Sequence, residues 1–233
     1  MPHLSLRLLG PFRGALDGEP LDGFRSDKVR ALLAYLCVEC QRPWPRETLA
    51  HLLWADFPET NARSNLRNAL SNLRTVIGDR RADPPFLDIS RATVQFNDGS
   101  DWWVDVRAFL ELVPEGDRDE GHLSDEDVDR LEEALALYRG RFLEGIAVDS
   151  APFEEWVVTT AEGLRRKLLR TARRLALAHA ASGDLTASTE VTRRWLALEP
   201  WDEAAHRHMM QLLALRGQRS AALAHYQACR RAL

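Results

Sequence analysis

Apolar and polar residues alternate with two different periods along the first hundred residues. Leu4, Leu6 and Leu8 alternate with polar residues, as in a β-strand with one buried face. Turn signals at Gly10-Pro11 and Asp17-Gly18 flank a second short run. The pattern therefore predicts a small N-terminal hairpin or sheet.

The period then becomes helical, which predicts two consecutive short helices. The first has Ser26 as its N-cap candidate and ends before Pro43. The second has Pro45 in its first turn and ends before Pro58. Both have apolar residues at helical spacing, so each is expected to cover a core with one face.

A third, longer helix and a hairpin complete the N-terminal half. The helix is predicted from about Glu59 to Ile77, with Gly78 as its C-cap. Residues 86–97, FLDISRATVQFN, alternate again on both sides of a turn at 90–92. Strands, three helices and a hairpin, in this order, are typical of a winged helix-turn-helix domain.

The second half is predicted to be helical. An acidic segment with few apolar residues lies between Pro114 and Asp129 and is expected to be a linker. Beyond it, Gly183 and Gly217 lie one tetratricopeptide period apart, each between two helix-length segments. We therefore predict a mostly α fold with small β-sheets: a winged helix domain at 1–113, a linker at 114–129 and an all-α tetratricopeptide-like domain at 130–233. Because the sequence ends within a helical pattern, we expect the natural protein to continue.

The third helix carries the most informative chemistry. Its outward positions hold Arg, Asn and Ser, and no acidic residue lies between Asn61 and Gly78. Arginine suits guanine edges and phosphates, and asparagine suits adenine, so this face favours insertion into the major groove of DNA. The predicted DNA-contacting residues of this helix are Arg63, Ser64, Arg67, Asn68, Ser71 and Arg74. The alternative is an ordinary solvated helix face, although such faces usually mix acidic with basic residues.

Three further basic residues are candidates for DNA contacts. Arg91 lies at the predicted hairpin tip and is expected to touch phosphate or the minor groove, unless it is a solvated turn residue. Lys28 and Arg46 lie at helix starts, where backbone amides also favour phosphate. For each of the latter two taken alone, a solvated surface residue is the simpler interpretation.

Composition and charge narrow the class of protein. The formal net charge is −4, so the strongly basic balance of many nucleic-acid binders is missing and DNA binding would depend on local charge. Three cysteines, an odd number, argue against a disulfide framework and fit a reducing compartment. No apolar run is long enough for a membrane helix, and the start is no secretory signal. We expect a cytoplasmic protein without membrane contact.

Other motifs are too weak to predict catalysis. Cys37 and Cys40 have half of a zinc-site spacing but lie within a helix without a second pair, and His206 and His208 are expected on different helix faces. Phosphate-binding loops, zinc-protease motifs and hydrolase motifs are absent from the sequence. We expect no metal, no cofactor and no enzymatic activity.

Several longer segments together resemble the Streptomyces antibiotic regulatory protein family. They include SDKVRALLAYL, RETLAHLLWADFPETNARSNLRNALSNLRTVIG, LYRGRFLEGI and LEPWDEAAHRHMMQLLALRGQRSAALAHYQACRRAL. The resemblance implies an OmpR-like winged helix joined to a bacterial transcriptional activator domain, with similarity to members that head larger multidomain activators. It also implies binding of promoter repeats, recruitment of RNA polymerase holoenzyme and a helical domain used for homodimerisation or regulation.

Two functional hypotheses follow. The first is a sequence-specific regulator of transcription, an activator that binds double-stranded promoter DNA. The second is a protein-interaction module, in which the winged helix and the repeats bind a partner protein. DNA binding at two salt concentrations distinguishes them, because phosphate contacts weaken as salt rises.

Overall fold

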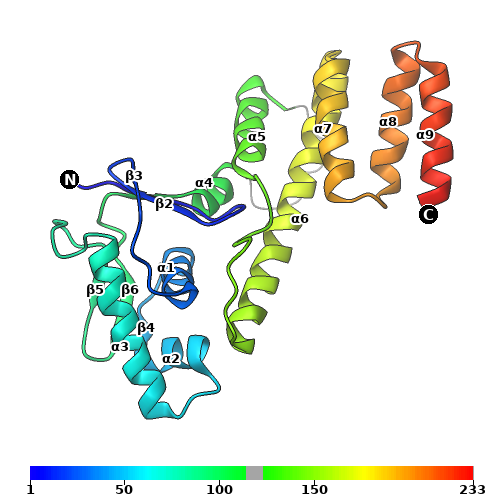
Figure 1. Ribbon diagram of the computed structural model, residues 1–233. Coiled ribbons are helices and arrows are strands. Elements are labelled where there is room, and N and C mark those ends of the chain that lie inside the picture. The colour runs from blue at the N-terminus through cyan, green and yellow to red at the C-terminus, as the bar shows by residue number, and fades with distance from the viewer. Residues whose placement is uncertain (114–122, 233) are drawn as a thin grey trace. The chain divides into compact units, whose positions relative to one another are not determined.

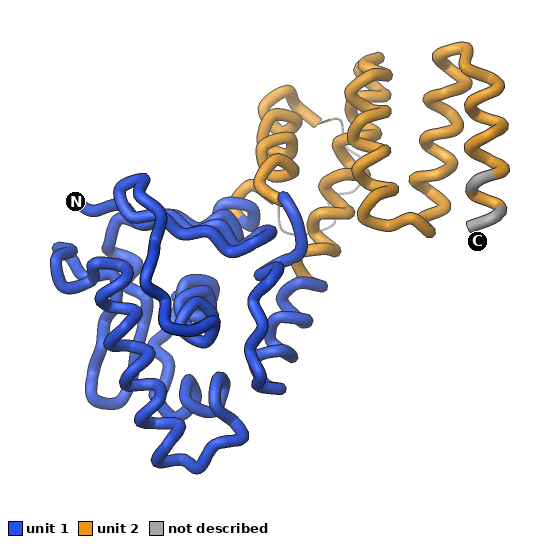
Figure 2. Tube along the Cα trace, in the orientation of Figure 1, with its two compact units in different colours: residues 1–110, 139–162 blue, residues 111–138, 163–233 orange. Residues whose placement is uncertain are grey.

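The computed structural model describes residues 1–113 and 123–232. They form two compact units, shown in Figure 2. Unit 1 comprises Met1–Leu110 with Arg139–Glu162, and unit 2 comprises Glu111–Tyr138 with Gly163–Leu233. Each unit is therefore built from two separate stretches of the chain.

Unit 1 begins with a four-stranded sheet of order β3-β2-β1-β7. The strands are β1 (Leu4–Arg7), β2 (Arg13–Leu16), β3 (Glu19–Pro20) and β7 (Trp102–Val104). Leu4 and Leu6 are fully buried, whereas Ser5 and Arg7 point to the other face, as the alternation predicts. The parallel pairing of β1 with β7 joins segments about a hundred residues apart, and the local pattern gave no sign of it.

Three helices and a second sheet follow (Figure 1). The helices are α1 (Asp27–Val38), α2 (Arg46–Trp54) and α3 (Glu59–Val76). The sheet has the order β4-β6-β5, with β4 (Trp44–Pro45), β5 (Leu87–Ile89) and β6 (Thr93–Phe96). This confirms the predicted fold class and the hairpin, but Pro45 lies in β4 and not in the first turn of a helix.

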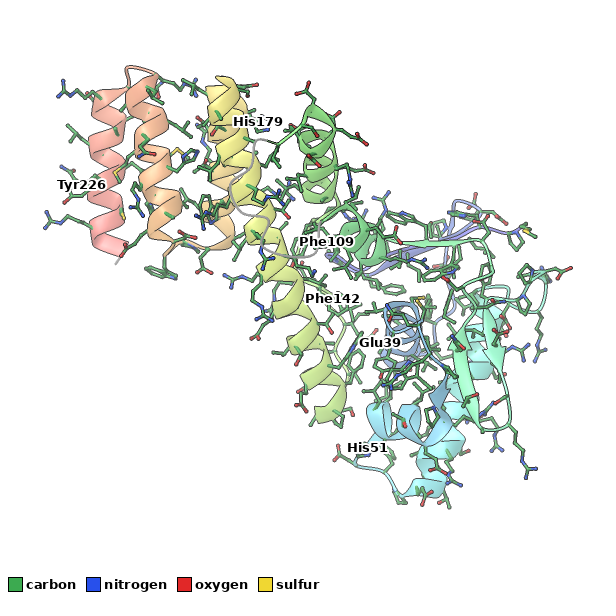
Figure 3. All side chains as sticks on the ribbon, turned by 180° about the vertical axis from the view of Figure 1, so that it is seen from behind. Glu39, His51, Phe109, Phe142, His179 and Tyr226 are labelled. Carbon is green, nitrogen blue, oxygen red and sulfur yellow. The ribbon has the colours of Figure 1, made fainter. Side chains whose placement is uncertain are left out.

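The segment Arg139–Glu162 packs with unit 1, which differs from the predicted division into 1–113 and 130–233. Its backbone donates to the chain after β1: Arg139 N to Leu9 O at 3.0 Å and Leu143 N to Leu8 O at 2.9 Å. Trp156 donates from Nε1 to Glu39 Oε1 at 3.0 Å, and Figure 3 shows Glu39 near the end of α1. These contacts connect residues too far apart in sequence for a local pattern to predict.

Asp105 holds the same region together from α4 (Asp105–Leu112). Its buried carboxylate accepts from Leu8 N at 2.7 Å, from Leu9 N at 3.0 Å and from Arg139 Nη2 at 3.1 Å. Burial raises the pKa of this carboxyl group, and the hydrogen bonds partly oppose that rise. Because all three donors face one side chain, a single carboxylate fixes two distant segments.

Unit 2 contains helices, the last four of which follow one another through short turns. They are α5 (Asp125–Leu137), the later part of α6 (Ala151–Ser182), α7 (Leu185–Leu198), α8 (Glu203–Leu215) and α9 (Arg219–Ala232). Gly183 and Gly217 have positive φ angles of 86° and 72° and separate α6 from α7 and α8 from α9, as the repeat predicts. Residues 114–122 of the predicted linker lie outside the described residues. Residues 125–129 form the start of α5 and are not linker.

Side-chain caps fix where these helices begin. Ser124 forms a capping box with Asp127 at the start of α5. Asp184 accepts from the backbone at the start of α7, and Asp202 does so for α8. In the part of the chain that the structure describes, no helix is both long and apolar enough to cross a membrane.

Candidate nucleic-acid interface

Helix α3 has one buried face and one exposed polar face. Leu66, Leu70 and Leu73 are buried against the rest of unit 1, where α3 packs on α1 and α2. Arg67, Asn68 and Ser71 are exposed on the other face. The apolar spacing fixes this orientation, because inward leucines leave the intervening polar residues in solvent.

Arg67 is the least engaged arginine of α3. Its Nη2 donates to Ser64 Oγ at 3.3 Å, and within residues 1–113 and 123–232 it forms no ion pair. Ser64 itself is half-buried one turn earlier. The Arg67 guanidinium therefore has most of its donors available for a ligand.

A small hollow lies beside the exposed face of α3. It has a volume of about 220 Å³ and is lined by Asn65, Asn68 and Asn72, together with Arg25 and Ser26 from the start of α1. Asn72 has a structural role, since its Oδ1 accepts from Arg25 N at 3.0 Å and its Nδ2 donates to Gly23 O at 3.1 Å. Asn68 is the exposed amide of this group.

Arg63 is held by two carboxylates, one of which belongs to the neighbouring helix α2. Its Nη2 lies 2.5 Å from Glu47 Oε1 on α2 and 2.6 Å from Glu59 Oε1 at the start of α3. All three side chains are more than half exposed, so water screens both pairs. Glu47 was missed because the acid-free stretch was counted along one helix, whereas this acid comes from its neighbour.

Arg74 is used inside the fold. Its Nε donates to Asp79 Oδ2 at 2.7 Å, and Asp79 is buried. The other oxygen, Asp79 Oδ1, accepts from Leu87 N at 2.9 Å. Arg74 thus ties the end of α3 to β5, and about a third of its side chain stays exposed.

Arg91 and Arg46 both lie at the hairpin of β5 and β6. Arg91 is exposed at the tip, where Ser90 Oγ accepts from Thr93 N at 2.8 Å and closes the turn. Arg46, at the start of α2, donates from Nε to Ser90 O at 3.1 Å. Arg46 therefore braces the hairpin, and Arg91 extends from it.

Lys28 lies inside unit 1 and not at a free helix start. Its Nζ donates to Leu53 O at 2.6 Å and to Asp149 O at 3.3 Å, and it lies 5.5 Å from the ring centroid of Trp54. Burial lowers the pKa of this amine, although Asp149 and Asp56 act in the opposite direction. The Lys28 amine is therefore already engaged by two backbone carbonyls of unit 1.

The thiols and imidazoles have other surroundings. Cys37 is fully buried in α1, and burial raises its pKa, which disfavours the reactive thiolate. His206 shares a hydrogen bond of 3.0 Å with His225 and another of 2.9 Å with Pro200 O. Among the described residues, no three metal-ligating side chains come together.

The family follows from a comparison with known proteins. Residues 104–233, more than half of the chain, match the family model of the bacterial transcriptional activator domain. The chain belongs to this family. The match covers α4 to α9 and includes the segment Arg139–Glu162 that packs with unit 1.

Similar proteins agree with this family. The transcriptional regulatory protein EmbR of Mycobacterium tuberculosis and that of Mycobacterium bovis are each 35% identical over 82 residues, which is 35% of this chain and 21% of the relative. The structure of M. tuberculosis EmbR in complex with a low-affinity phosphopeptide has a TM-score of 0.77, with 24% identity, over 100% of this chain and 60% of that one. The resemblance to the Streptomyces antibiotic regulatory proteins and the fold class are thereby confirmed.

Proposed function

We propose that this member of the family binds double-stranded DNA in a sequence-specific way and regulates transcription from the promoters that it recognises. The observation that carries the proposal is Arg67, exposed beside Asn68 and Ser71 on a helix whose opposite face is buried. An α-helix fits the major groove, which is about 12 Å wide. The 18 residues of α3 extend over about 27 Å, enough to cross the groove.

The roles of individual residues follow from their surroundings. We assign Arg67 to a guanine edge and Asn68 to an adenine edge, the pairings that suit their donors and acceptors. Ser64 and Ser71 are short enough to let the helix approach the DNA closely. Arg91 at the hairpin tip is assigned to phosphate or to the minor groove.

The remaining basic candidates are assigned supporting roles. Arg74, Arg46 and Lys28 hold elements of unit 1 through Asp79, Ser90 and Leu53, so we propose that they position the interface without reading bases. We propose that Arg63 contacts DNA once its ion pairs with Glu47 and Glu59 are broken. This division concentrates the recognition on the middle of α3.

Activation itself is proposed from the family and the similar regulators. Recruitment of RNA polymerase holoenzyme, binding to repeated half-sites and homodimerisation are the roles that this resemblance suggests. The proposal includes no catalytic step, and the named relatives are transcriptional regulatory proteins.

The test begins with selection of binding duplexes from a random-sequence library by the full chain. Arg67→Ala should then weaken binding to the selected duplex by about 1–3 kcal/mol, roughly 5-fold to 150-fold, and leave thermal stability unchanged. Arg173→Ala is the matched control, because it removes an exposed helical arginine from unit 2. No enrichment of any duplex, or equal affinities of the two variants, contradicts the proposal.

A second candidate function is the binding of a partner protein by unit 2. Large apolar side chains are exposed near its C-terminal end: Leu215 is 70% exposed, Leu223 61% and Tyr226, labelled in Figure 3, 48%. Such exposed apolar groups favour protein contacts. If a Leu223→Ser/Tyr226→Ser variant selects the same duplexes as the unmodified chain, recognition of DNA is assigned to unit 1 alone.

A further inference from the structure

A hollow on the N-terminal sheet is separate from the residues assigned to DNA. Its volume is about 570 Å³, within the range of small-molecule sites in proteins. Ser5 and Arg7 of β1 and Arg13 of β2 line it, together with Phe12, Leu21 and Arg30. The hollow thus combines three guanidinium groups with an aromatic ring and an aliphatic side chain.

Two of these arginines form an unusual cross-strand pair. Arg7 and Arg13 are directly opposite each other in the antiparallel register of β1 and β2. Both are exposed, and neither has an ion pair or a side-chain hydrogen bond to any residue that the structure describes. Like charges in this position repel each other and destabilise a sheet. The free protein therefore has an uncompensated double positive charge at the hollow.

The third arginine is already neutralised and held in place. Arg30 Nη1 lies 2.7 Å from Asp27 Oδ1, and its guanidinium stacks 5.0 Å from the ring centroid of Phe24. Phe24 in turn meets the ring of Phe12 edge to face at 5.6 Å. This stack gives the hollow an ordered wall with apolar and cationic parts.

We propose that this hollow binds a small phosphorylated molecule, with its phosphate monoester between Arg7 and Arg13. A phosphate monoester has a charge of about −1.5 to −2 at pH 7, which matches the two unpaired guanidinium groups. Its three oxygens accept the paired N–H donors of arginine. Phe12 and Leu21 contact the apolar or ring portion of the ligand. A DNA phosphate diester has a single charge and leaves this pair half neutralised.

The test is binding of three probes to the full chain, measured by calorimetry and by thermal denaturation: inorganic phosphate, ribose 5-phosphate and adenosine 5′-monophosphate. Sodium sulfate and sodium chloride at equal ionic strength are the controls for unspecific ion effects. We expect at least one organic phosphate to bind more tightly than inorganic phosphate and to raise the melting temperature. Equal shifts with sulfate, or no binding by any phosphate at millimolar concentration, overturn the proposal.

Variants separate a binding role from a structural one. Arg13→Gln should weaken phosphate binding by about tenfold or more, because a charge-assisted hydrogen bond is lost. The same variant should melt at an equal or higher temperature without ligand, since the repulsion with Arg7 is removed. Arg173→Gln is the matched control and should keep the affinity of the unmodified chain. Unchanged phosphate affinity in an Arg7→Gln/Arg13→Gln variant overturns the assignment.

Phosphate binding at the hollow can be tested separately from the proposed DNA binding. Arg67→Ala should leave phosphate binding intact, and Arg13→Gln should leave duplex affinity unchanged at fixed salt. If Arg13→Gln weakens duplex binding as strongly as Arg67→Ala does, the pair contacts the DNA backbone and the small-molecule proposal is wrong.

Discussion

Helices α3 and α7 both contain arginine, serine and threonine side chains, but these side chains have opposite surroundings in the two helices. In α3, Arg67, Asn68 and Ser71 are exposed. In α7, Ser188 and Thr192 are fully buried, and their hydroxyl groups donate to Ala176 O and Ser188 O, each at 2.6 Å. A polar side chain can recognise a ligand only where the fold leaves its hydrogen-bonding capacity unused, so composition alone does not identify a binding helix.

Arginine shows the same contrast. Arg67 of α3 has a single weak contact within its own helix. Arg194 of α7 donates from Nη2 to Leu135 O and to Tyr138 O at the C-terminal end of α5, where the helix dipole favours a cation. Burial lowers the pKa of Arg194, which agrees with a desolvated position. Arg74 lies in α3, but like Arg194 it donates its hydrogen bond to an acceptor within the fold.

The largest expected effect tests whether Arg74 is structural. Asp79→Ala leaves Leu87 N–H without its acceptor and Arg74 without its counter-ion, so the free energy of unfolding should fall by about 3 kcal/mol. Guanidinium chloride denaturation measures the change. Asp79→Asn is the matched control, because an amide oxygen can still accept from Leu87 N, and its loss should be smaller. An unchanged stability in Asp79→Ala would show that Arg74, like Arg67, is not held in place by an ion pair.

A smaller loss of stability is expected when the half-buried arginine of α7, Arg194, is replaced. Arg194→Ala removes two charge-assisted hydrogen bonds from a half-buried site, so stability should fall by about 2 kcal/mol while duplex affinity stays constant. The neighbouring Arg193 is exposed, and Arg193→Ala should change stability by less than about 0.5 kcal/mol. Denaturation monitored by circular dichroism measures both free energies of unfolding. Equal values for Arg194→Ala and Arg193→Ala would contradict a structural role for Arg194.

The smallest expected effect concerns Arg63. Glu47→Gln removes one of two exposed carboxylates that compete with DNA for its guanidinium, so duplex affinity should rise by up to about fivefold, or about 1 kcal/mol. Titrations of the selected duplex at low salt measure this gain. The gain in duplex affinity should disappear when Arg63→Ala is also present. This control separates the loss of the Glu47–Arg63 ion pair from a general change in charge. A gain in affinity that persists in the Glu47→Gln/Arg63→Ala double variant would show that Glu47 acts without Arg63.

Local patterns predicted the elements of both units more completely than their assembly. The inward leucines of α3, the hairpin around Arg91 and the turns at Gly183 and Gly217 follow from spacing within short segments. The placement of Arg139–Glu162 with unit 1 does not, because its partners at Leu8 and Leu9 lie about 130 residues away. Periodicity describes one element at a time, whereas packing joins elements through specific contacts.

The candidate interface shows the same limit. Exposure of Arg67, Asn68 and Ser71 follows from the helical period. The partners of Lys28 and Arg46 are backbone carbonyls at Leu53 and Ser90, and no sequence pattern marks a carbonyl as an acceptor. Whether these residues bind DNA stays a prediction, and their contacts favour a supporting role.

The sequence by itself determined which helices are amphipathic, where they end and which polar residues lie opposite the apolar faces, because these properties depend on spacing and on turn residues. Only the tertiary structure decided which charged groups are already paired. Arg63, Arg67 and Arg74 have the same chemistry in the same helix, but Glu47 and Asp79 reach two of them from other segments. Electrostatic pairing depends on distances of a few ångströms in space, and those distances are fixed by packing.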